Sequence, residues 1–593
     1  MMEENSGIVT NLEQPEAVIE QPEAVIEQPK AANDQASAVQ EKKHSSFSKL
    51  LNRYFHHIDR GGTLGGEIGA GITMMILSVC SIFLTMQVIA NAQGAGSLTV
   101  GESGDFYATT YLAAILVSFI GTLVVGIVAR LPFVQTSSLS LTVMMISMVG
   151  AGSGLTYYNV LFISFLSSII YAVIVSVPVV KKYVFQALPA SIRKILPAIS
   201  GAIIIVLALQ TLGLLGIGDV LVSVPGNAPT DYSWGGILSL PQISTGYGDS
   251  ASYGAMYAGL LAGAIAIIIY ALMKSFKVKH PVGWTLLLGT LVYFCIAAIM
   301  DINIVIGWAR LWLIGSEDAL QAHVGNAFSA VFASIGKVFS KEGGLDFSNY
   351  EGSVFGLISG GLVCFLMLSM YDGQSTLQAT SEKLGFNSDD VNDIWLAQTC
   401  NAGLGVVSAL FGTTPVSLGK ESVAGADDNA KSGIASIVAA IGLLISAFVW
   451  IIPGVMATFV NLNIAFANGE YGHYDMGSLQ MTLYCTFGVA DAVMIALGLK
   501  MMKCLGDIDY SDVKEWMPAI IALVFSVAFT NLAYGVALGV IAYAVLKLAA
   551  FKKEGKTLSV SFKENFVANL KTFPVSTAVL TLLSIVMVLT LMV

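Results

Sequence analysis

The sequence predicts an all-α polytopic membrane protein with about fourteen transmembrane helices, arranged as two inverted repeats of seven. Three observations support this: the composition, the recurrence of long apolar runs, and two polar segments that interrupt them. Of the 593 residues, 55% are hydrophobic and only 11% are charged, whereas soluble domains carry roughly 25% charged residues. Most of the net charge of −10 belongs to the N-terminal tail, because residues 1–41 contain nine acids and one lysine. The composition therefore indicates a lipid-embedded chain.

Residues 1–60 are expected to form a disordered cytoplasmic tail. They are polar, they repeat the segment QPEAVIE from Gln14 and from Gln21, and they lack the layout of a signal peptide. A docking or regulatory arm is the alternative interpretation of this repeat. Basic residues gather before the first apolar run, namely Lys42, Lys43, Lys49, Arg53 and Arg60. By the positive-inside rule they place the N-terminus in the cytoplasm of a multi-pass protein of the cell membrane.

The apolar runs have the length, about 20 residues, that crosses ~30 Å of hydrocarbon as a helix. In the first repeat, 61–301, spans are expected near 68–92, 107–131, 133–151, 157–180, 194–214, 253–273 and 281–301. An extracytoplasmic loop, 302–352, precedes the second repeat, 353–549, with spans near 353–371, 394–411, 412–430, 432–459, 478–502, 515–532 and 533–549. Lysines follow the fourth and sixth spans, so the positive-inside rule places both of these loops in the cytoplasm. Spans that cross the membrane in alternating directions from a cytoplasmic N-terminus require the same placement.

The last segment, 550–593, combines a lysine-rich stretch with an apolar run from 573 to 593. The sequence leaves open whether this run is a fifteenth span or whether two earlier short segments form one span. An odd number of spans in each repeat forces the two repeats into opposite orientations. Inverted repeats of this kind place a substrate site near the bilayer midplane.

Two polar segments with a proline stand where a span should be apolar, at the equivalent third and tenth positions. They are LPFVQTSSLSLT, 131–142, and FGTTPVSLGKES, 411–422. Pro132 and Pro415 remove a backbone donor and disfavour helix in the preceding residue, so short extended segments are expected. Such extended backbone is tolerated in a membrane only where it is buried in protein or lines a cavity. A half-helix that follows it then points its free backbone amide groups into that cavity. The alternative interpretation is a pair of polar helix ends at the membrane surface.

Ionisable residues within spans are costly in lipid and therefore point to function. Asp372 ends the eighth span, and Glu421 follows the broken segment of the tenth. If both face one cavity, they can accept hydrogen bonds from ligand NH groups and take up a proton. Asp491 is expected to pair internally. Lys420 is expected to point to a different helix face from Glu421, because adjacent positions do not face each other.

Other classes of chemistry lack their sequence signals. No histidine is expected to be buried, so no metal site is predicted, and the six cysteines form no CxxC pair. The chain has neither a GxxxxGK[ST] phosphate loop nor a GxSxG nucleophile elbow. The sequence thus indicates neither an ATP-driven pump nor an enzyme, and no bound cofactor or nucleic-acid partner is expected.

Five stretches resemble one family of transporters. They are GEIGAGIT with FLTM after it (66–86), GTLVVGIVARLPF (121–133), GTTPVSLGKESVAG (412–425), DIDYSDVKEWMPA (507–519) and YGVALGVIAYAVLKL (534–548). Their order and spacing are similar to those of the AzgA-like purine permease branch of the nucleobase:cation symporter-2 family, which has the uracil-permease fold. The resemblance runs from about Glu67 to Leu548, and its last two stretches together are quite specific.

The resemblance implies a fourteen-span proton-coupled importer with a core domain, the first four spans of each repeat, and a gate domain, the last three. The family's substrate-binding glutamate matches Glu421, and the second aspartate of its eighth-span motif matches Asp372. The sequence departs from the family at Ser369, which replaces the first aspartate of that motif, and at Thr142, where the family has asparagine. Gln135 and Thr136 also replace apolar positions.

These observations lead to the expectation of proton-coupled uptake of a purine or related nucleobase, with sodium left open as the coupling ion. The residues expected to bind the substrate are Glu421, Asp372, Gln135, Thr136, Ser369, Thr414 and Ser417. Asp372 and Glu421 are also expected to couple transport to protons. A homodimer is compatible with the sequence. The alternatives are carriage of another small polar solute or an anion on the same fold, or a membrane sensor that binds without transporting.

Overall fold

The computed structural model divides into two compact units, Met1–Leu50 and Leu51–Val593. The residues that it describes are 46–94, 103–149, 155–211, 250–300, 329, 331–341, 343–350, 352–385, 392–451, 488–549, 569–571 and 573–591. The expected tail 1–60 is not disordered throughout, because α2 (Ser46–Phe55) is a helix. The remainder of that tail, 1–45, lies outside the described residues.

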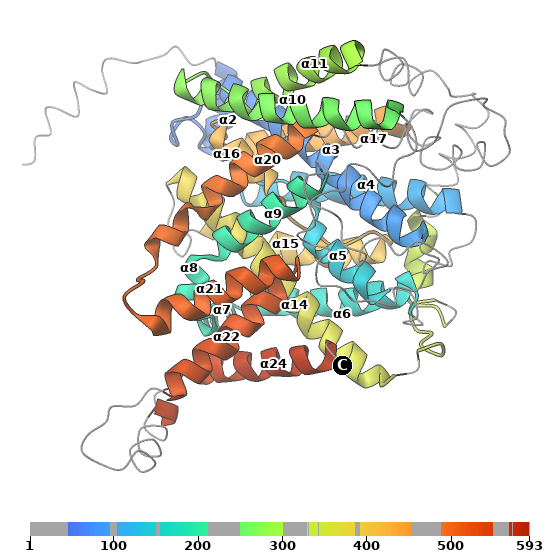
Figure 1. Cartoon of the computed structure of the whole chain (residues 1–593), viewed down its shortest axis with the longest axis vertical. Coiled ribbons are helices and arrows are strands. Elements are labelled where there is room, and N and C mark those ends of the chain that lie inside the picture. The colour runs from blue at the N-terminus through green and yellow to red at the C-terminus, as the bar shows by residue number, and fades with distance from the viewer. Residues whose placement is uncertain are drawn as a thin grey trace, which may run out of the picture. The chain divides into compact units, whose positions relative to one another are not determined.

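The second unit is built almost entirely of helices (Figure 1). The elements of its first part are α3 (Leu64–Gly94), α4 (Ser103–Val128), β1 (Gln135–Ser137), α5 (Leu139–Met148), α6 (Tyr157–Ser176), α7 (Pro178–Ala187), α8 (Ala190–Lys194), α9 (Leu196–Thr211), α10 (Ser250–Ser275) and α11 (Pro281–Met300). Those of its second part are α14 (Val354–Leu384), α15 (Asn392–Leu410), β2 (Val416–Leu418), α16 (Glu421–Asp427), α17 (Gly433–Ile451), α20 (Gly488–Met501), the 3-10 helix η2 (Met502–Asp507), α21 (Val513–Ala528), α22 (Leu532–Ala549) and α24 (Val575–Leu591).

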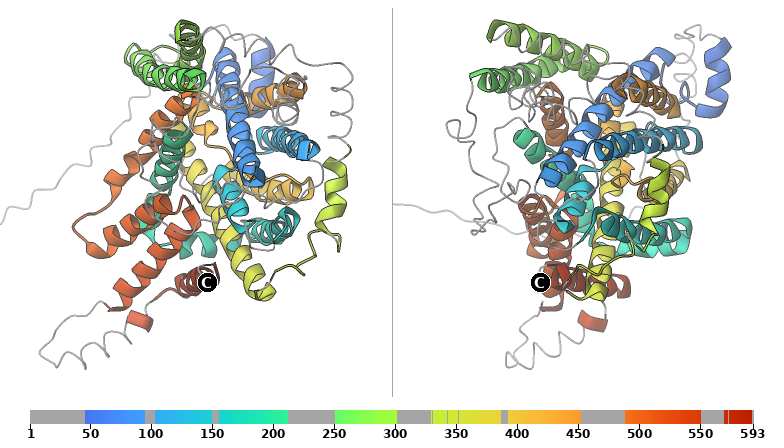
Figure 2. Two further views of the ribbon diagram at one scale, coloured as in Figure 1. Left: turned by 45° about the vertical axis from the view of Figure 1, so that its right-hand side comes forward. Right: turned by 90° about the vertical axis from the view of Figure 1, so that its right-hand side faces the viewer.

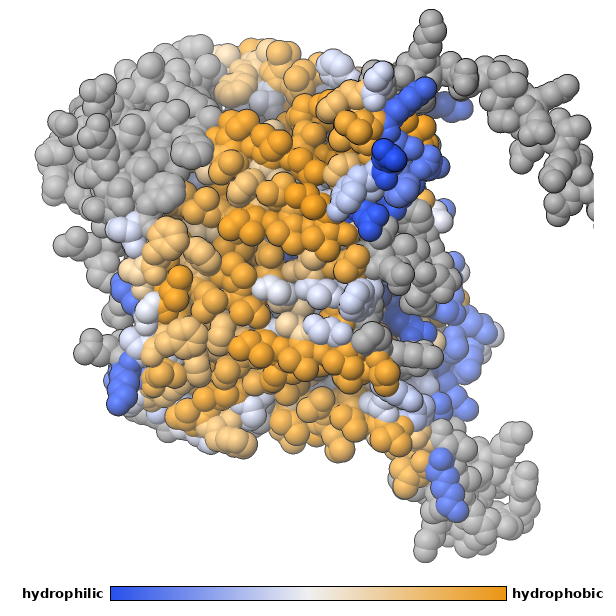
Figure 3. All heavy atoms as spheres, turned by 180° about the vertical axis from the view of Figure 1, so that it is seen from behind, coloured by the Kyte–Doolittle hydropathy of each residue, from blue (hydrophilic) through white to orange (hydrophobic). Residues whose placement is uncertain are grey.

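Within the described residues, six helices are long and apolar enough to cross a membrane: α3, α4, α6, α11, α14 and α22. Six further apolar helices of 10–17 residues accompany them. Large apolar side chains face outward, for example Ile299 at 85% and Phe355 at 84% exposure, and apolar residues cover most of the face in Figure 3. A water-soluble protein rarely exposes so continuous an apolar surface, whereas a bilayer solvates it. The chain is a multi-pass membrane protein.

The helices fall into two sets by their packing. The first set, called the bundle, holds α3, α4, α5, α6, α14, α15, α16 and α17. Within it α3 and α4 pack on α17, α14 and α15 pack on α6, and α4 meets α15. The second set, called the row, runs in the spatial order α11, α10, α20, α9, α21, α22, each helix packing on the next. Figures 1 and 2 show this row along one side of the bundle.

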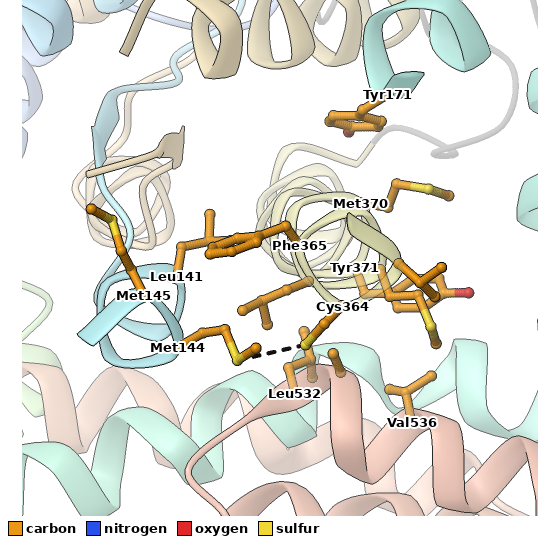
Figure 4. Close-up of a cluster of buried hydrophobic side chains, with 14 of the residues drawn as sticks. Leu141, Met144, Met145, Tyr171, Cys364, Phe365, Met370, Tyr371, Leu532 and Val536 are labelled. Atoms are coloured by element: carbon orange, nitrogen blue, oxygen red, sulfur yellow. Dashed lines mark hydrogen bonds between the residues drawn. The ribbon is translucent and has the colours of Figure 1, made fainter. Parts of the chain in front are cut away.

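The two sets meet through different kinds of contact. Near the start of α22, a cluster of buried apolar side chains joins α5 and α14 of the bundle to α22 of the row (Figure 4). Met144, Cys364 and Leu532 belong to this cluster, and Cys364 Sγ lies 3.6 Å from Met144 Sδ. Near α10 and α20, a second apolar cluster of alanine, valine, leucine and tyrosine side chains joins Leu77 of α3 and Ala424 of α16 to the row.

The predicted broken helices are confirmed. The third expected span consists of β1 followed by α5, and the tenth consists of β2 followed by α16. The long loop 302–352 includes a helix at 331–338. One expectation needs correction, because His57 is fully buried although no buried histidine was expected. The apolar run near the C-terminus forms α24, which packs on α14, α22 and α7.

Candidate functional site

The candidate site lies where two short strands pair between helices. β1 and β2 run antiparallel, with Thr136 directly opposite Ser417. Backbone pairing continues beyond the strands, where Ser138 N donates to Pro415 O at 3.1 Å. Because Pro415 has no N–H and follows a break in the helix, this pairing replaces the helical hydrogen bonds that the segment lacks.

Hydroxyl groups of neighbouring helices satisfy the outer edges of this two-stranded ribbon. Gln135 N donates to Thr122 Oγ1 of α4 at 2.9 Å. Val416 N donates to Ser408 Oγ of α15 at 3.4 Å. An unpaired edge would be costly at membrane depth, since no water is present to bond it. These serine and threonine hydroxyls therefore make extended backbone possible inside the bundle.

Strand alternation separates the side chains of the ribbon into two groups. Thr136, Ser138 and Ser417 share one face and contact the two acidic residues described below. Gln135 and its opposite residue Leu418 lie on the other face. Leu418 there packs among apolar side chains of α4, α14 and α15. The predicted site residue Gln135 is thus not brought together with the acids.

Asp372 of α14 lies at the centre of a polar cluster. Its Oδ1 accepts a hydrogen bond from Lys420 Nζ at 2.5 Å, within an ion pair. Its Oδ2 accepts from Ser417 Oγ at 2.6 Å and from Ser138 Oγ at 3.0 Å. The carboxylate side chain is only 1% exposed, so each of these donors replaces solvation that water would otherwise give.

Glu421 is the first residue of α16 and is buried. Its Oε2 accepts a hydrogen bond from Thr136 Oγ1 at 3.3 Å, and the Ser81 side chain of α3 also hydrogen-bonds it. A carboxylate at the N-terminal turn of a helix is favoured by the helix dipole. The Thr136 and Ser81 hydroxyls are its side-chain hydrogen-bond donors, and the charge of neighbouring Lys420, whose ammonium bonds Asp372, also acts on Glu421.

Gly419 separates Leu418 of the ribbon from the start of α16, and the site needs a glycine there. A Cβ at this position would come within 2.5 Å of Thr136 Oγ1 and would overlap Glu421 Oε2. The close approach of the backbone to the acid therefore depends on the missing side chain.

Buried carboxamides extend the polar region along α14 and α15, and the sequence did not single them out. Gln398 donates through Nε2 to Gln374 Oε1, and Asn401 lies beside Gly373 and hydrogen-bonds Tyr171. The available signal was their spacing, because Gln398 and Asn401 stand three residues apart on one face of α15. Gln374 follows Asp372 on α14, and polar atoms with adaptable donors and acceptors suit recognition of a small polar ligand.

The remaining predicted site residues occupy varied positions. Thr414 is buried, and its Oγ1 has no hydrogen-bond partner within the described part of the chain. Ser369 is half-buried one helical turn before Asp372. Asp491 is buried in the first turn of α20, and both it and Glu421 interact electrostatically with Cys80. Among the described residues, no group of three or more histidine, cysteine or acidic side chains could hold a metal ion.

Comparison with known proteins found permeases that align with most of the chain. Adenine permease AdeP of Escherichia coli (strain K12) is 20% identical over 511 residues, covering 86% of this chain and 93% of AdeP. Guanine/hypoxanthine permease GhxP of Escherichia coli O157:H7 is 21% identical, covering 82% and 89%. Guanine/hypoxanthine permease PbuO of Bacillus subtilis (strain 168) is 21% identical, covering 84% and 95%. No family model matches the chain.

Solved transporter structures show a more distant likeness. The transmembrane domain of the cyanobacterial bicarbonate transporter BicA gives a TM-score of 0.36 at 15% identity, covering 73% of this chain and 97% of that one. Murine Slc26a9 in its inward-facing state gives 0.42 at 12% identity, covering 90% and 76%. Likeness at this level carries no argument about the site.

The apolar helices define the class of the chain, a multi-pass membrane protein, and the relatives named above are permeases, that is, transporters rather than enzymes. More particularly, its relatives are purine and nucleobase permeases, which bears out the resemblance to the nucleobase:cation symporter-2 family.

Proposed function

We propose that this protein is a secondary transporter that takes up a purine or a related nucleobase together with protons. The observation that carries the proposal is the position of Glu421 at the start of a half-helix, beside the paired strands. Nucleobases present NH donors and carbonyl or ring-nitrogen acceptors on one planar edge. A buried carboxylate can accept from those donors, and the carboxamide and hydroxyl groups nearby can satisfy the rest.

Glu421 is the carboxylate that exchanges the proton in this proposal. Asp372 was expected to share that role, but its Oδ1 is paired with Lys420 and its Oδ2 with two serine hydroxyls. We propose that this ion pair and its two hydroxyl partners assign Asp372 to holding the site together, and that the proton taken up with the substrate goes to Glu421. Glu421 has hydroxyl partners that bond either protonation state and can therefore gain and lose a proton as the substrate binds and leaves.

Fourteen spans in two inverted repeats are proposed for the membrane domain. They are α3, α4, β1–α5, α6, α9, α10 and α11, followed by α14, α15, β2–α16, α17, α20, α21 and α22. The packing supports this pairing of spans. The contact of α4 with α17 has its counterpart in that of α15 with α6, and α3 with α17 in α14 with α6. In the row, the α10–α11 pair at one end corresponds to the α21–α22 pair at the other.

In this proposal the bundle serves as the expected core domain and the row as the expected gate domain. The site lies wholly on bundle elements, since its side chains come from α3, β1, α14, α15, β2 and α16. Transport by alternating access then requires the bundle to move against the row and to expose the site to each side in turn. Apolar side chains make up much of the contact between the two sets, and the polar contacts between them are concentrated at Asp427 and Asp428 at the end of α16.

Uptake of radiolabelled bases into cells that lack their own nucleobase permeases tests the substrate. We expect at least one of adenine, guanine, hypoxanthine, xanthine and uracil to accumulate, and its uptake to fall when the proton gradient is collapsed with an ionophore. Failure of all five to accumulate, with the protein present in the membrane, overturns the nucleobase assignment. Accumulation that follows a sodium gradient instead overturns only the coupling ion.

Carriage of a small anion is the second candidate, and Lys420 is the observation that favours it. A lysine ammonium in the site, 15% exposed and close to the N-terminal turn of α16, is chemistry that an oxyanion can use. Its pairing with Asp372 competes with that use. Counterflow of labelled sulfate or bicarbonate in proteoliposomes, tested beside the five bases, distinguishes the two candidates.

A further inference from the structure

Two consecutive acids end α16 at the edge of the contact between the bundle and the row. The first, Asp427, accepts a hydrogen bond at Oδ2 from the hydroxyl of Tyr270 on α10 at 2.7 Å. The same oxygen pairs with Lys274 of α10 at 2.9 Å and with Lys500 of α20 at 2.8 Å. Its Oδ1 lies 3.6 Å from Lys383 at the end of α14. One carboxylate of the bundle thus holds the ends of two row helices.

The second acid, Asp428, is fully buried and caps a third row helix. Its Oδ1 accepts from Val282 N at 3.0 Å, and its Oδ2 accepts from Gly283 N at 3.1 Å and from Thr73 Oγ1 of α3 at 2.8 Å. Val282 and Gly283 belong to the first turn of α11, whose free amide groups need partners. The start of α11 therefore depends on a carboxylate that belongs to the bundle.

The sequence segment of the first repeat that is equivalent to α16 and its two acids carries no charged residue. Residues 139–154, which contain α5 and the segment after it, include no acidic residue. The start of α22 corresponds to the start of α11, and its own Asn531 caps it by accepting from Ala533 N at 2.9 Å. It contacts the bundle through the apolar cluster of Figure 4, where Leu532 lies near Met144, and through an uncharged hydrogen bond from Asn531 Nδ2 to Met144 Sδ at 3.4 Å. The acids thus clamp one end of the bundle–row contact only.

We propose that Asp427 and Asp428 form a latch that keeps the bundle closed on the row at this end and biases the resting protein toward the state open at the opposite end. Each contact that the two acids make with α10, α11 and α20 must break when the bundle moves against the row. The apolar cluster at the other end can slide with little change in hydrogen bonding. The asymmetry of the two ends, rather than either contact alone, sets the bias.

The latch rests on the proposed alternating movement. The side of the membrane on which it lies follows from the expected orientation of the chain. α10, α14 and α20 all end here with a lysine, and the positive-inside rule assigns such ends to the cytoplasm. The site is then presented to the outside at rest, as suits a protein that captures a scarce solute. Asp427 is 12% exposed and its lysines 24–36%, so salt weakens this part of the latch, whereas buried Asp428 is shielded.

The distance between one spin label on each set tests the latch without any substrate. Gly65→Cys on α3 and Lys279→Cys before α11 are exposed positions, and a Cβ at Gly65 meets open space. The labels are read by double electron–electron resonance in nanodiscs, in a background whose six native cysteines are serine. We expect one dominant distance in the starting protein. Asp427→Asn and Asp428→Asn should each raise the ratio of the longer to the shorter distance by about tenfold.

A matched control and a milder variant distinguish a loss of the latch from a general loss of folded structure. Asp509→Asn removes the same charge from an exposed loop acid that accepts hydrogen bonds from Ser511, and it should leave the distances unchanged. Lys274→Met with Lys500→Met loosens Asp427 while Asp428 stays in place, and should shift the ratio by a smaller factor. Unchanged distances in Asp428→Asn and in the double lysine variant, with both proteins folded by their melting curves, refute the latch.

A covalent version of the latch supplies the converse test. A Cβ on Gly283 would lie 2.9 Å from Thr73 Oγ1, so Thr73→Cys with Gly283→Cys places two thiols within reach of a disulfide. Oxidation should hold the shorter distance in the Asp427→Asn background, and reduction should release it. If the oxidised protein still shows the longer distance, this end of the contact does not open. Neither outcome depends on which solute the protein carries.

Discussion

The ammonium of Lys420 lies 2.5 Å from Oδ1 of Asp372, although the two residues are 48 positions apart and belong to different helices. This ion pair joins α14 to the start of α16, beside the strands that interrupt the third and tenth spans. In the proposed cycle, the carboxylate that gains and loses the proton is Glu421, and the Lys420–Asp372 pair holds the site together.

Breaking this pair should destabilise the protein more than removing both partners. Lys420→Met leaves the buried Asp372 carboxylate without its counter-charge, which costs about 3–5 kcal/mol when a buried pair is broken. Asp372→Asn with Lys420→Met should recover most of that loss, because neither charge remains. Melting curves of the purified single and double variants in detergent measure the coupling. Additive losses in the double variant would contradict a direct pair.

Replacing Glu421 should remove both substrate affinity and proton coupling. Glu421→Gln deletes charge-assisted hydrogen bonds worth about 1.5–3 kcal/mol, so the Kd should rise roughly 10- to 150-fold. Remaining flux should no longer increase as the external pH falls, since glutamine takes up no proton. Glu382→Gln, on an exposed turn of α14, is the matched control and should behave as the unaltered protein. Unchanged affinity across pH in Glu421→Gln refutes its role.

The sequence allowed prediction of those features that local chemistry determines. Apolar runs of spanning length gave the order of the helices, and Pro132 and Pro415 located both interruptions, because proline cannot continue a helix. Glu421 and Asp372 could be singled out since carboxylates are rare in lipid. The adjacent positions of Lys420 and Glu421 also indicated, correctly, that they face different partners.

Features that depend on tertiary pairing could not be predicted in this way. The register of β1 on β2 decides that Thr136 faces the acids and Gln135 faces away, and no local signal fixes that register. The partner of Lys420 comes from α14, far along the chain. Asp427 and Asp428 fall at the polar end of an expected span, and their partners lie on five other helices. Sequence periodicity carries no information about such contacts.

Substitutions on the two faces of β1 should have different effects. Thr136→Val removes a hydroxyl that donates to Glu421, so the KM should rise several-fold, in line with a loss of about 1 kcal/mol. Gln135→Leu keeps the size of a side chain whose carboxamide has no partner within the described residues, so the KM should hold and stability should stay equal or increase. Initial rates of uptake across substrate concentrations, with melting curves, check both. A larger rise in KM for Gln135→Leu would contradict this arrangement.

Gly419 should tolerate no side chain, since the space beside it belongs to the acid. A methyl group there overlaps Glu421 Oε2 and approaches Thr136 Oγ1, so Gly419→Ala must displace either the carboxylate or the ribbon. Because the neighbouring atoms include the functional group itself, substrate affinity should fall more than tenfold while most of the helical packing persists. Gly403→Ala on α15, where a Cβ meets no atom within 4 Å, is the control and should bind as the unaltered protein. Calorimetric titration measures the substrate affinity of both variants. A local effect at Gly419 leaves the affinity of Gly403→Ala unchanged, whereas a general intolerance of added volume lowers the affinity of both.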